Sequence, residues 1–255
     1  MNQKHRRAGV LLALLPMLTA GTAVGEERNA GPAQVMEQPA LDLLRGMSSK
    51  LAAAKSFTFR TRSSIEAPGG TGQFLSFFAD SEAAVMRPDK VSARIRGDAP
   101  PFDFYFDGAR MTVYEPTAKL YASEDAPKTI DDMLPFAAQK AGILLPFADV
   151  LYSDPYAVLT RGITSAFYAG YSTIGGARCA HLALSAPGID WQIWINTETS
   201  LPCLLTGAMR DVQGAPRFAV EFADWKLDAP LAPEGFVLVR PADADRMDFR
   251  ALTGQ

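Results

Sequence analysis

Histidine and cysteine are scarce in this sequence, which has two of each in 255 residues. Beyond the first 25 residues His181 is the only histidine, so a zinc site built on several histidines is excluded. A catalytic triad would have to use His181, which lies inside an apparent strand, and no G-x-S-x-G string accompanies it. Redox, zinc-ribbon and phosphate-loop motifs are also missing. The sequence therefore predicts no enzyme, metal or cofactor, and a structural or surface role for His181.

Long apolar runs are missing after the N-terminus, so we expect no transmembrane segment. At the N-terminus itself, three basic residues precede an apolar stretch over residues 8–18 and small residues over 19–25. This order is typical of a secretory signal peptide. We predict a signal peptide over residues 1–25, cleaved between Gly25 and Glu26 at an Ala-x-Gly site. No cysteine lies near this point, so no lipid anchor is expected.

Basic residues are in the minority, with 25 Lys and Arg against 28 Asp and Glu. The leader removes Lys4, Arg6 and Arg7 but no acid, which leaves 22 against 28 and a formal charge of −6. Nucleic acids and anionic membrane surfaces both attract basic proteins. We therefore expect neither as a partner. About 230 residues with 48% hydrophobic composition are enough to bury a full core.

Short runs of alternating apolar and polar residues make up most of the mature chain. A polar, flexible arm over 26–39 precedes a stretch from Ala40 to about Lys55, where apolar residues recur at helical spacing. The period then changes to two. Strands are predicted at about 57–66, 72–86, 91–96, 102–106, 111–114, 179–185, 189–195, 201–206 and 218–227. Short turns between consecutive strands predict antiparallel pairing.

Residues 128–160 interrupt the strands with a helical or irregular pattern. Thr129 can cap a helix whose first turn carries Asp131 and Asp132. These two acids could also bind a cation, although a helix-end charge pair is the commoner explanation. An antiparallel sheet with a preceding helix and a helical insert is an α+β fold. We expect residues 40–255 to form one domain, in which the sheet curls and the helices cover its concave face.

Cys179 and Cys203 leave two alternatives open. Export permits a structural disulfide, whereas two buried thiols are the simpler state. The segment between them is predicted to be a three-stranded meander, and the outer strands of a flat meander are too far apart for a bond between sulfur atoms. A bridge would therefore require a bulge or a different strand order.

Aromatic residues are abundant, with 15 Phe, 7 Tyr and 3 Trp. Many occupy alternate strand positions, where core packing is the simpler explanation for any one of them. The functional interpretation is that part of this face lines a cavity for an acyl chain or another apolar ligand, because such pockets are mostly apolar. The candidate lining residues, two of them from the helical cover, are Phe57, Phe59, Phe102, Phe104, Phe106, Met133, Phe136, Trp191 and Ile193.

Several longer strings can be compared with a known family. They are Arg87-Pro88-Asp89-Lys90-Val91, Phe106-Asp107-Gly108 and the stretches 43–51, 56–59, 114–116, 145–151, 175–183, 190–195 and 201–203. In these strings the chain resembles a family of predicted periplasmic proteins, a domain of unknown function within the LolA/LolB-like lipoprotein-carrier superfamily. The resemblance implies an unclosed antiparallel half-barrel around helices, with an apolar cavity for acyl chains. It implies no reaction, no cofactor and no established site residue.

Together these features predict a periplasmic protein that binds or carries a lipid, an acylated lipoprotein or another apolar ligand, and acts as a monomer. A cavity filled completely by the protein's own side chains would count against this function. The alternative is a protein–protein interaction or envelope-sensor module without lipid cargo. An exposed apolar patch outside the cavity mouth would favour that alternative.

Overall fold

The computed structural model describes residues 35–249, which form one curled sheet of twelve strands with three α-helices. The predicted signal peptide, its cleavage site and residues 26–34 of the predicted arm lie outside the described residues. The helical elements are α1 (Gln38–Ala53), α2 (Ile130–Ala141) and α3 (Pro155–Leu159), with 3-10 turns η1 (Ala148–Val150) and η2 (Pro233–Phe236). The strands are β1 (Ser56–Pro68), β2 (Phe74–Met86), β3 (Lys90–Gly97), β4 (Phe102–Phe106), β5 (Arg110–Glu115), β6 (Leu120–Asp125), β7 (Ser165–Ile174), β8 (Ala177–Ala186), β9 (Ile189–Asn196), β10 (Pro202–Met209), β11 (Arg217–Leu227) and β12 (Asp245–Arg246).

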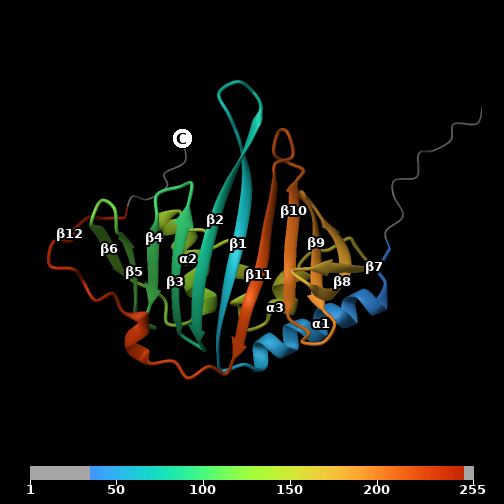
Figure 1. Ribbon diagram of the computed structural model, residues 1–255, viewed down its shortest axis with the longest axis horizontal. Coiled ribbons are helices and arrows are strands. Elements are labelled where there is room, and N and C mark those ends of the chain that lie inside the picture. The colour runs from blue at the N-terminus through green and yellow to red at the C-terminus, as the bar shows by residue number, and fades with distance from the viewer. Residues whose placement is uncertain (1–34, 250–255) are drawn as a thin grey trace, which may run out of the picture. The chain divides into compact units, whose positions relative to one another are not determined.

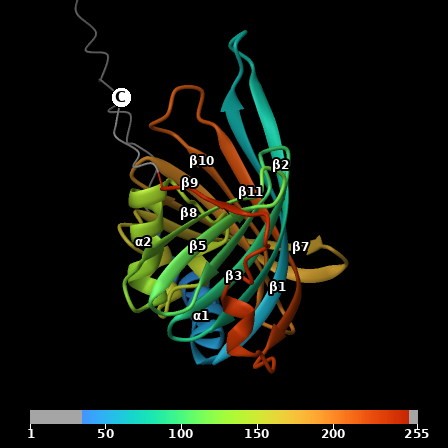
Figure 2. The same ribbon diagram turned by 90° about the vertical axis from the view of Figure 1, so that its left-hand side faces the viewer.

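The sheet has the strand order β12-β6-β5-β4-β3-β2-β1-β11-β10-β9-β8-β7 and is not closed. Every pair of neighbours is antiparallel except β12 with β6. In Figure 1 the sheet faces the viewer with the helices behind it, and Figure 2 shows it curving around α1 and α2. The predicted α+β class with a curled antiparallel sheet is confirmed.

The first helix begins earlier than the sequence pattern suggested. We expected residues 26–39 to form a flexible arm, but α1 begins at Gln38, and Met36 forms a parallel bridge with Ala166 on β7. The Glu37 carboxylate also accepts a hydrogen bond of 2.9 Å from the backbone N–H of Tyr168. These bonds fix the described end of the arm to the last strand of the sheet, so the expectation is corrected for residues 35–39.

The helical insert lies between β6 and β7 and packs on the face of the sheet that we call the inner face. Helix α2 begins as predicted, because the Thr129 hydroxyl accepts the backbone N–H of Asp132 at 3.2 Å. The Asp131 carboxylate accepts hydrogen bonds from both the backbone and the hydroxyl of Ser153. This acid therefore ties α2 to the segment before α3. Among residues 35–249, no helix combines the length and apolarity needed to cross a membrane.

An aromatic cluster centred on Phe59 joins the insert to the sheet. The Phe59 ring on β1 lies 5.1 Å from that of Phe147, next to η1, and 4.5 Å from that of Trp225 on β11 (centroid distances). Phe57 and Phe222 complete the cluster at 6.1 and 5.9 Å from Phe59. Both Phe59 and Phe147 are almost fully buried. Stacked and edge-on aromatic pairs add stabilisation beyond the burial of their area, so this cluster holds the insert against the inner face.

A bulge in β11 brings Trp225 into that cluster. Phe218, Val220 and Phe222 alternate inward, so strict alternation would turn Asp224 inward and Trp225 outward. The register between β1 and β11 shifts at this point, and Asp224 adopts a φ of 55°. One extra residue on β11 reverses the alternation. The Trp225 ring therefore faces the core, and its Nε1–H donates to the Pro202 carbonyl at 3.1 Å.

A second bulge accompanies a disulfide between Cys179 on β8 and Cys203 on β10. These strands are separated by β9, so a flat sheet would place them roughly 9–10 Å apart. The register between β9 and β10 shifts between Pro202 and Leu204, and Cys203 is the extra residue. The two Cα atoms are 6.9 Å apart. The bulge at Cys203 is the kind of irregularity that we expected a disulfide between these two strands to need.

We expect Phe59→Ala to lower the free energy of unfolding by about 3–5 kcal/mol, because a large buried ring is lost from a packed cluster. Urea denaturation of both proteins would measure the difference. Phe78→Ala is the matched control, since Phe78 is 55% exposed and its loss should cost less than about 0.5 kcal/mol. Equal effects at both positions would contradict the central role of Phe59.

Replacing both cysteines with serine should lower the free energy of unfolding by about 3 kcal/mol, because the bridge closes a chain segment with a sequence separation of 24 residues. Thermal melting with and without a reductant would test this. The reductant should lower the midpoint of the wild type and leave that of the Cys179→Ser, Cys203→Ser double variant unchanged. A reductant-insensitive wild type would show that the cysteines are not bridged.

Candidate functional site

All nine residues proposed from the sequence to line a ligand cavity lie on the inner side of the sheet, in or against a single hydrophobic core. Seven of them are buried, while Phe102 and Phe136 are partly buried against the same core. The structure thus brings all nine together as a packed core, and Phe59 is in direct ring contact with Phe147 and Trp225.

The helices do not cover the whole length of the longest strands. Strands β1 and β2 have 13 residues each, which spans about 43 Å. Helix α2 has 12 residues and spans about 18 Å. Figure 1 shows the β1–β2 hairpin projecting beyond the other strands. The inner face of this hairpin therefore continues past its helical cover.

The uncovered end of this face is apolar. Ile65, Leu75 and Phe77 follow the inward-facing series of β1 and β2, yet they are 50%, 41% and 40% exposed. Ile65 is paired directly with Phe77 on one side and with the half-buried Phe218 on the other. Side chains opposite one another on neighbouring strands lie about 5 Å apart, so these residues form one continuous surface. We call these four residues the apolar strip.

Phe218 lies at one edge of the apolar strip, over a glycine. A Cβ atom built on Gly207 of β10 would lie 2.4 Å from the Phe218 ring, so any larger residue there would displace the ring. Gly207 is paired with Phe218 across β10 and β11. The absence of a side chain at Gly207 leaves room for the Phe218 ring, which lies next to Ile65.

Three hydroxyl groups lie between the apolar strip and the aromatic cluster. Thr61 and Ser81 are direct cross-strand partners on β1 and β2 and are 4% and 3% exposed. Neither hydroxyl oxygen has a hydrogen-bond partner among the described residues, whereas Ser63 donates to the Ala79 carbonyl at 3.2 Å. A buried hydroxyl without a partner costs about 1–3 kcal/mol. The Thr61–Ser81 pair can therefore offer two donors to a polar group that reaches the inner face.

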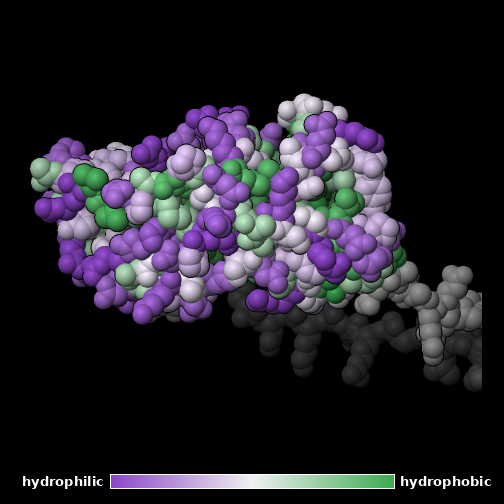
Figure 3. All heavy atoms as spheres, turned by 90° about the horizontal axis from the view of Figure 1, so that it is seen from below, coloured by the Kyte–Doolittle hydropathy of each residue, from purple (hydrophilic) through white to green (hydrophobic). Residues whose placement is uncertain are grey.

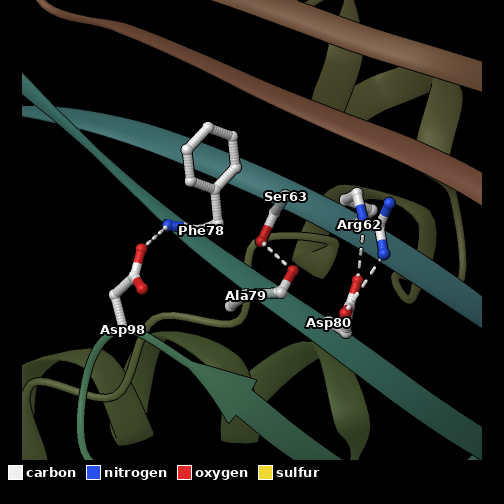
Figure 4. A network of polar contacts seen from close by, with 6 residues as sticks. All are labelled: Arg62, Ser63, Phe78, Ala79, Asp80 and Asp98. Atoms are coloured by element: carbon white, nitrogen blue, oxygen red, sulfur yellow. Dashed lines mark hydrogen bonds and ion pairs between the residues drawn. The ribbon is translucent and has the colours of Figure 1, made fainter.

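The outer face of the same strands is charged. Arg60 pairs with Glu82 at 2.9 Å and with Asp224 at 3.6 Å, and Arg62 pairs with Asp80 at 2.9 Å. The hydrogen bond from Arg62 lowers the pKa of the Asp80 carboxyl below its ordinary value, although desolvation opposes the shift. Figure 4 shows this pair beside the bond from Ser63 to Ala79.

Two open hollows of about 760 and 630 Å³ lie over this charged face and share Arg60, Glu82 and Arg94. Their lining is mostly polar or charged, unlike the apolar strip. Seen from below, the surface is largely hydrophilic with small separate hydrophobic patches (Figure 3). Alternating charges on the solvent side are typical of an antiparallel sheet covered on one face only.

His181 does not take part in the inner-face site. Its ring stacks on Trp194 with a centroid distance of 4.1 Å, and its Nε2 lies 2.8 Å from the Gln192 side-chain oxygen. These contacts fit the structural role expected from the sequence. Over residues 35–249 no group of three or more His, Cys, Asp or Glu residues is placed to hold a metal ion.

The sequence analysis missed the apolar strip, although one signal for it was present. In Phe74-Leu75-Ser76-Phe77-Phe78 four of five residues are apolar, which breaks the alternation expected of a half-buried strand. Apolar residues at both odd and even positions indicate that neither face of this segment is a purely solvated face.

The solved structures that are similar to this chain share little sequence with it. LppX of Mycobacterium tuberculosis is 13% identical, with 77% of this chain and 99% of LppX covered and a TM-score of 0.43. In the MucA/MucB complex of Pseudomonas aeruginosa the matched chain is 13% identical, with 78% and 61% covered and a TM-score of 0.42. The LolA superfamily protein NE2245 of Nitrosomonas europaea is 11% identical, with 78% and 97% covered and a TM-score of 0.33.

Similarity at the level of sequence families is more extensive. The sequence has no significant match among the curated proteins. The model of a family described as "Predicted periplasmic protein (DUF2092)" matches residues 40–250, which include the whole sheet, α2, α3 and all of α1 except its first two residues. A match over most of the chain establishes membership, so this protein belongs to the DUF2092 family of predicted periplasmic proteins.

Proposed function

We propose that this protein is an exported periplasmic protein that binds an apolar or acylated ligand on the inner face of its sheet. The observation that carries the proposal is the apolar strip, where the inner face continues beyond the helices as exposed Ile65, Leu75 and Phe77. Apolar surface in water is unfavourable by about 25 cal/mol per Å² relative to buried surface. A ligand chain lying along the strip would remove that surface from water.

The position of the strip suggests how a ligand would be oriented. An apolar chain on Ile65 and Phe77 would run along the axis of β1 and β2, and one end of it would approach Ser63. Thr61 and Ser81 lie next on the same face, with hydroxyl groups that lack partners among the described residues. A ligand with a carbonyl or carboxylate at one end of an acyl chain fits this order of groups.

Deeper binding would require the core to open. The nine residues first proposed as a cavity lining are packed against one another, so a chain could reach them only if the helical cover moved away from the sheet. Core side chains pack at crystal-like density, which leaves no room for an acyl chain beside them. This filled core counts against a ligand cavity among the nine residues, by the criterion set from the sequence. We therefore place the primary binding surface on the apolar strip, at the exposed end of the same face.

A protein–protein interaction module is the second candidate. Phe78, on the outer face of the same hairpin, is 55% exposed, and Val212 in the turn between β10 and β11 is 48% exposed. Exposed apolar residues outside the inner face favour contact with another protein. This function requires no lipid cargo.

Phe77→Ser should weaken binding of a fluorescent fatty acid by roughly tenfold, because it removes the largest exposed ring of the strip. Fluorescence titration of the mature protein would measure the dissociation constant. Phe78→Ser is the matched control, since it changes the same residue type one position along the strand but on the opposite face. Binding should be nearly unchanged in that variant.

Native mass spectrometry of protein purified without detergent would identify any natural ligand. An added mass that organic extraction assigns to a fatty acyl species, and that Phe77→Ser removes, would support the proposal. A bare protein mass together with no uptake of the fatty acid would exclude an acyl-binding function and leave the interaction module.

A further inference from the structure

One edge of strand β2 has no neighbouring strand near the β1–β2 turn. Strand β2 pairs with β1 along its whole length, from Phe74 to Met86. It pairs with β3 only from Ala79 to Met86, because β3 ends at Gly97. Residues 74–78 are therefore bonded to a strand on one side only within the part of the chain that the structure describes.

The Asp98 side chain marks the point where the ladder stops. Its carboxylate accepts the backbone N–H of Phe78 at 2.8 Å (Figure 4). Its own N–H donates to the Phe78 carbonyl at 2.9 Å. The backbone groups of Phe78 thus point toward β3. Because strand backbone groups alternate in direction, the N–H and C=O of Ser76 point the same way, to the side where no strand follows.

This free edge lacks the usual protection. Soluble proteins shield open edges with lysine, proline, a bulge or an inward charge. Residues 74–78 contain no charge and no proline, and their pairing with β1 shows no register shift. Leu75 and Phe77 on one face, and Phe78 on the other, are 40–55% exposed. An apolar edge of this kind is a template for one more strand.

We propose that an extended segment of a partner protein adds to β2 as a further strand beside residues 74–78. A partner strand can take the place of water on the outward N–H and C=O of Ser76, whereas an acyl chain would cover these groups without bonding them. Membrane insertion is disfavoured because the hairpin tip, Gly69-Gly70-Thr71-Gly72-Gln73, carries no large apolar side chain. Pairing of two copies over five residues would bury too little area for a stable dimer, which usually needs about 1,200 Å² or more.

Charge further defines the partner segment. Asp98 lies next to the free edge, where its carboxylate accepts the Phe78 N–H. Glu66, the partner of Ser76 on β1, is turned away from this edge, because its carboxylate accepts the Arg217 N–H on β11 at 2.8 Å. Among the ion pairs of residues 35–249, none includes Asp98. An added strand would therefore have apolar or β-branched residues at its centre and a basic residue at the end next to Asp98.

To test this proposal, a random library of displayed nine-residue peptides is screened for binding to the full mature protein. Binders should have uncharged, β-prone centres and a basic residue at the end that lies next to Asp98. Ser76→Pro should weaken them at least about tenfold, since it removes the outward N–H without touching the ladder to β1. Ser76→Ala, which keeps that N–H, should bind like the wild type, and hydrogen exchange should show the Ser76 amide protected in the complex.

Three outcomes would overturn strand addition. They are no enrichment of any peptide, equal binding to the Ser76→Pro and Ser76→Ala proteins, and binding to vesicles of phosphatidylethanolamine and phosphatidylglycerol that Ser76→Pro does not alter. Thermal melting would confirm that both variants fold. Fatty-acid binding should survive Ser76→Pro, so this inference and the proposed acyl-binding function can fail separately.

Discussion

The contact between Phe59 and Phe147 is the interaction on which the rest of this structure depends. It attaches the helical insert to the middle of the sheet, while the bulge at Asp224 adds Trp225 to the same cluster. A sheet of twelve strands with an apolar inner face needs a cover, and the insert supplies much of it. The cluster thus holds the insert on the curled face, whereas α1 is also held by the contacts of Met36 and Glu37 with β7.

A second constraint is the mismatch in length between strands and helices. The β1–β2 hairpin is longer than its cover, so one pair of strands serves two purposes along its length. Near Phe57 and Phe59 the strand pair contributes buried side chains to the packed core. Near Ile65 and Phe77 the same pair presents an exposed apolar surface. The unpartnered hydroxyls of Thr61 and Ser81 lie at the boundary between these two regions. Ligand binding and partner binding are both proposed for the exposed end, on the inner face and on the edge respectively.

Much of the architecture could be predicted because it depends on local periodicity. The alternation from Phe57 to Ile65 defined β1, helical spacing defined α1, and Thr129 marked the start of α2. Strand β6, the two-residue β12 and the anchoring of Met36 to β7 were missed. Those features depend on neighbours distant in the sequence. The alternation of β11 was also misleading at Trp225, where one extra residue reversed the direction of the side chain.

The sequence by itself determined that this chain is an α+β protein with an antiparallel sheet and an aromatic inner face, because period and turn chemistry are local properties. It also placed the nine candidate residues on one side of the sheet. Only the tertiary structure decided that these residues pack against one another, that Cys203 lies in a bulge within reach of Cys179, and that Ile65 and Phe77 remain exposed. Burial depends on what covers a side chain, and that cover comes from residues far away along the chain.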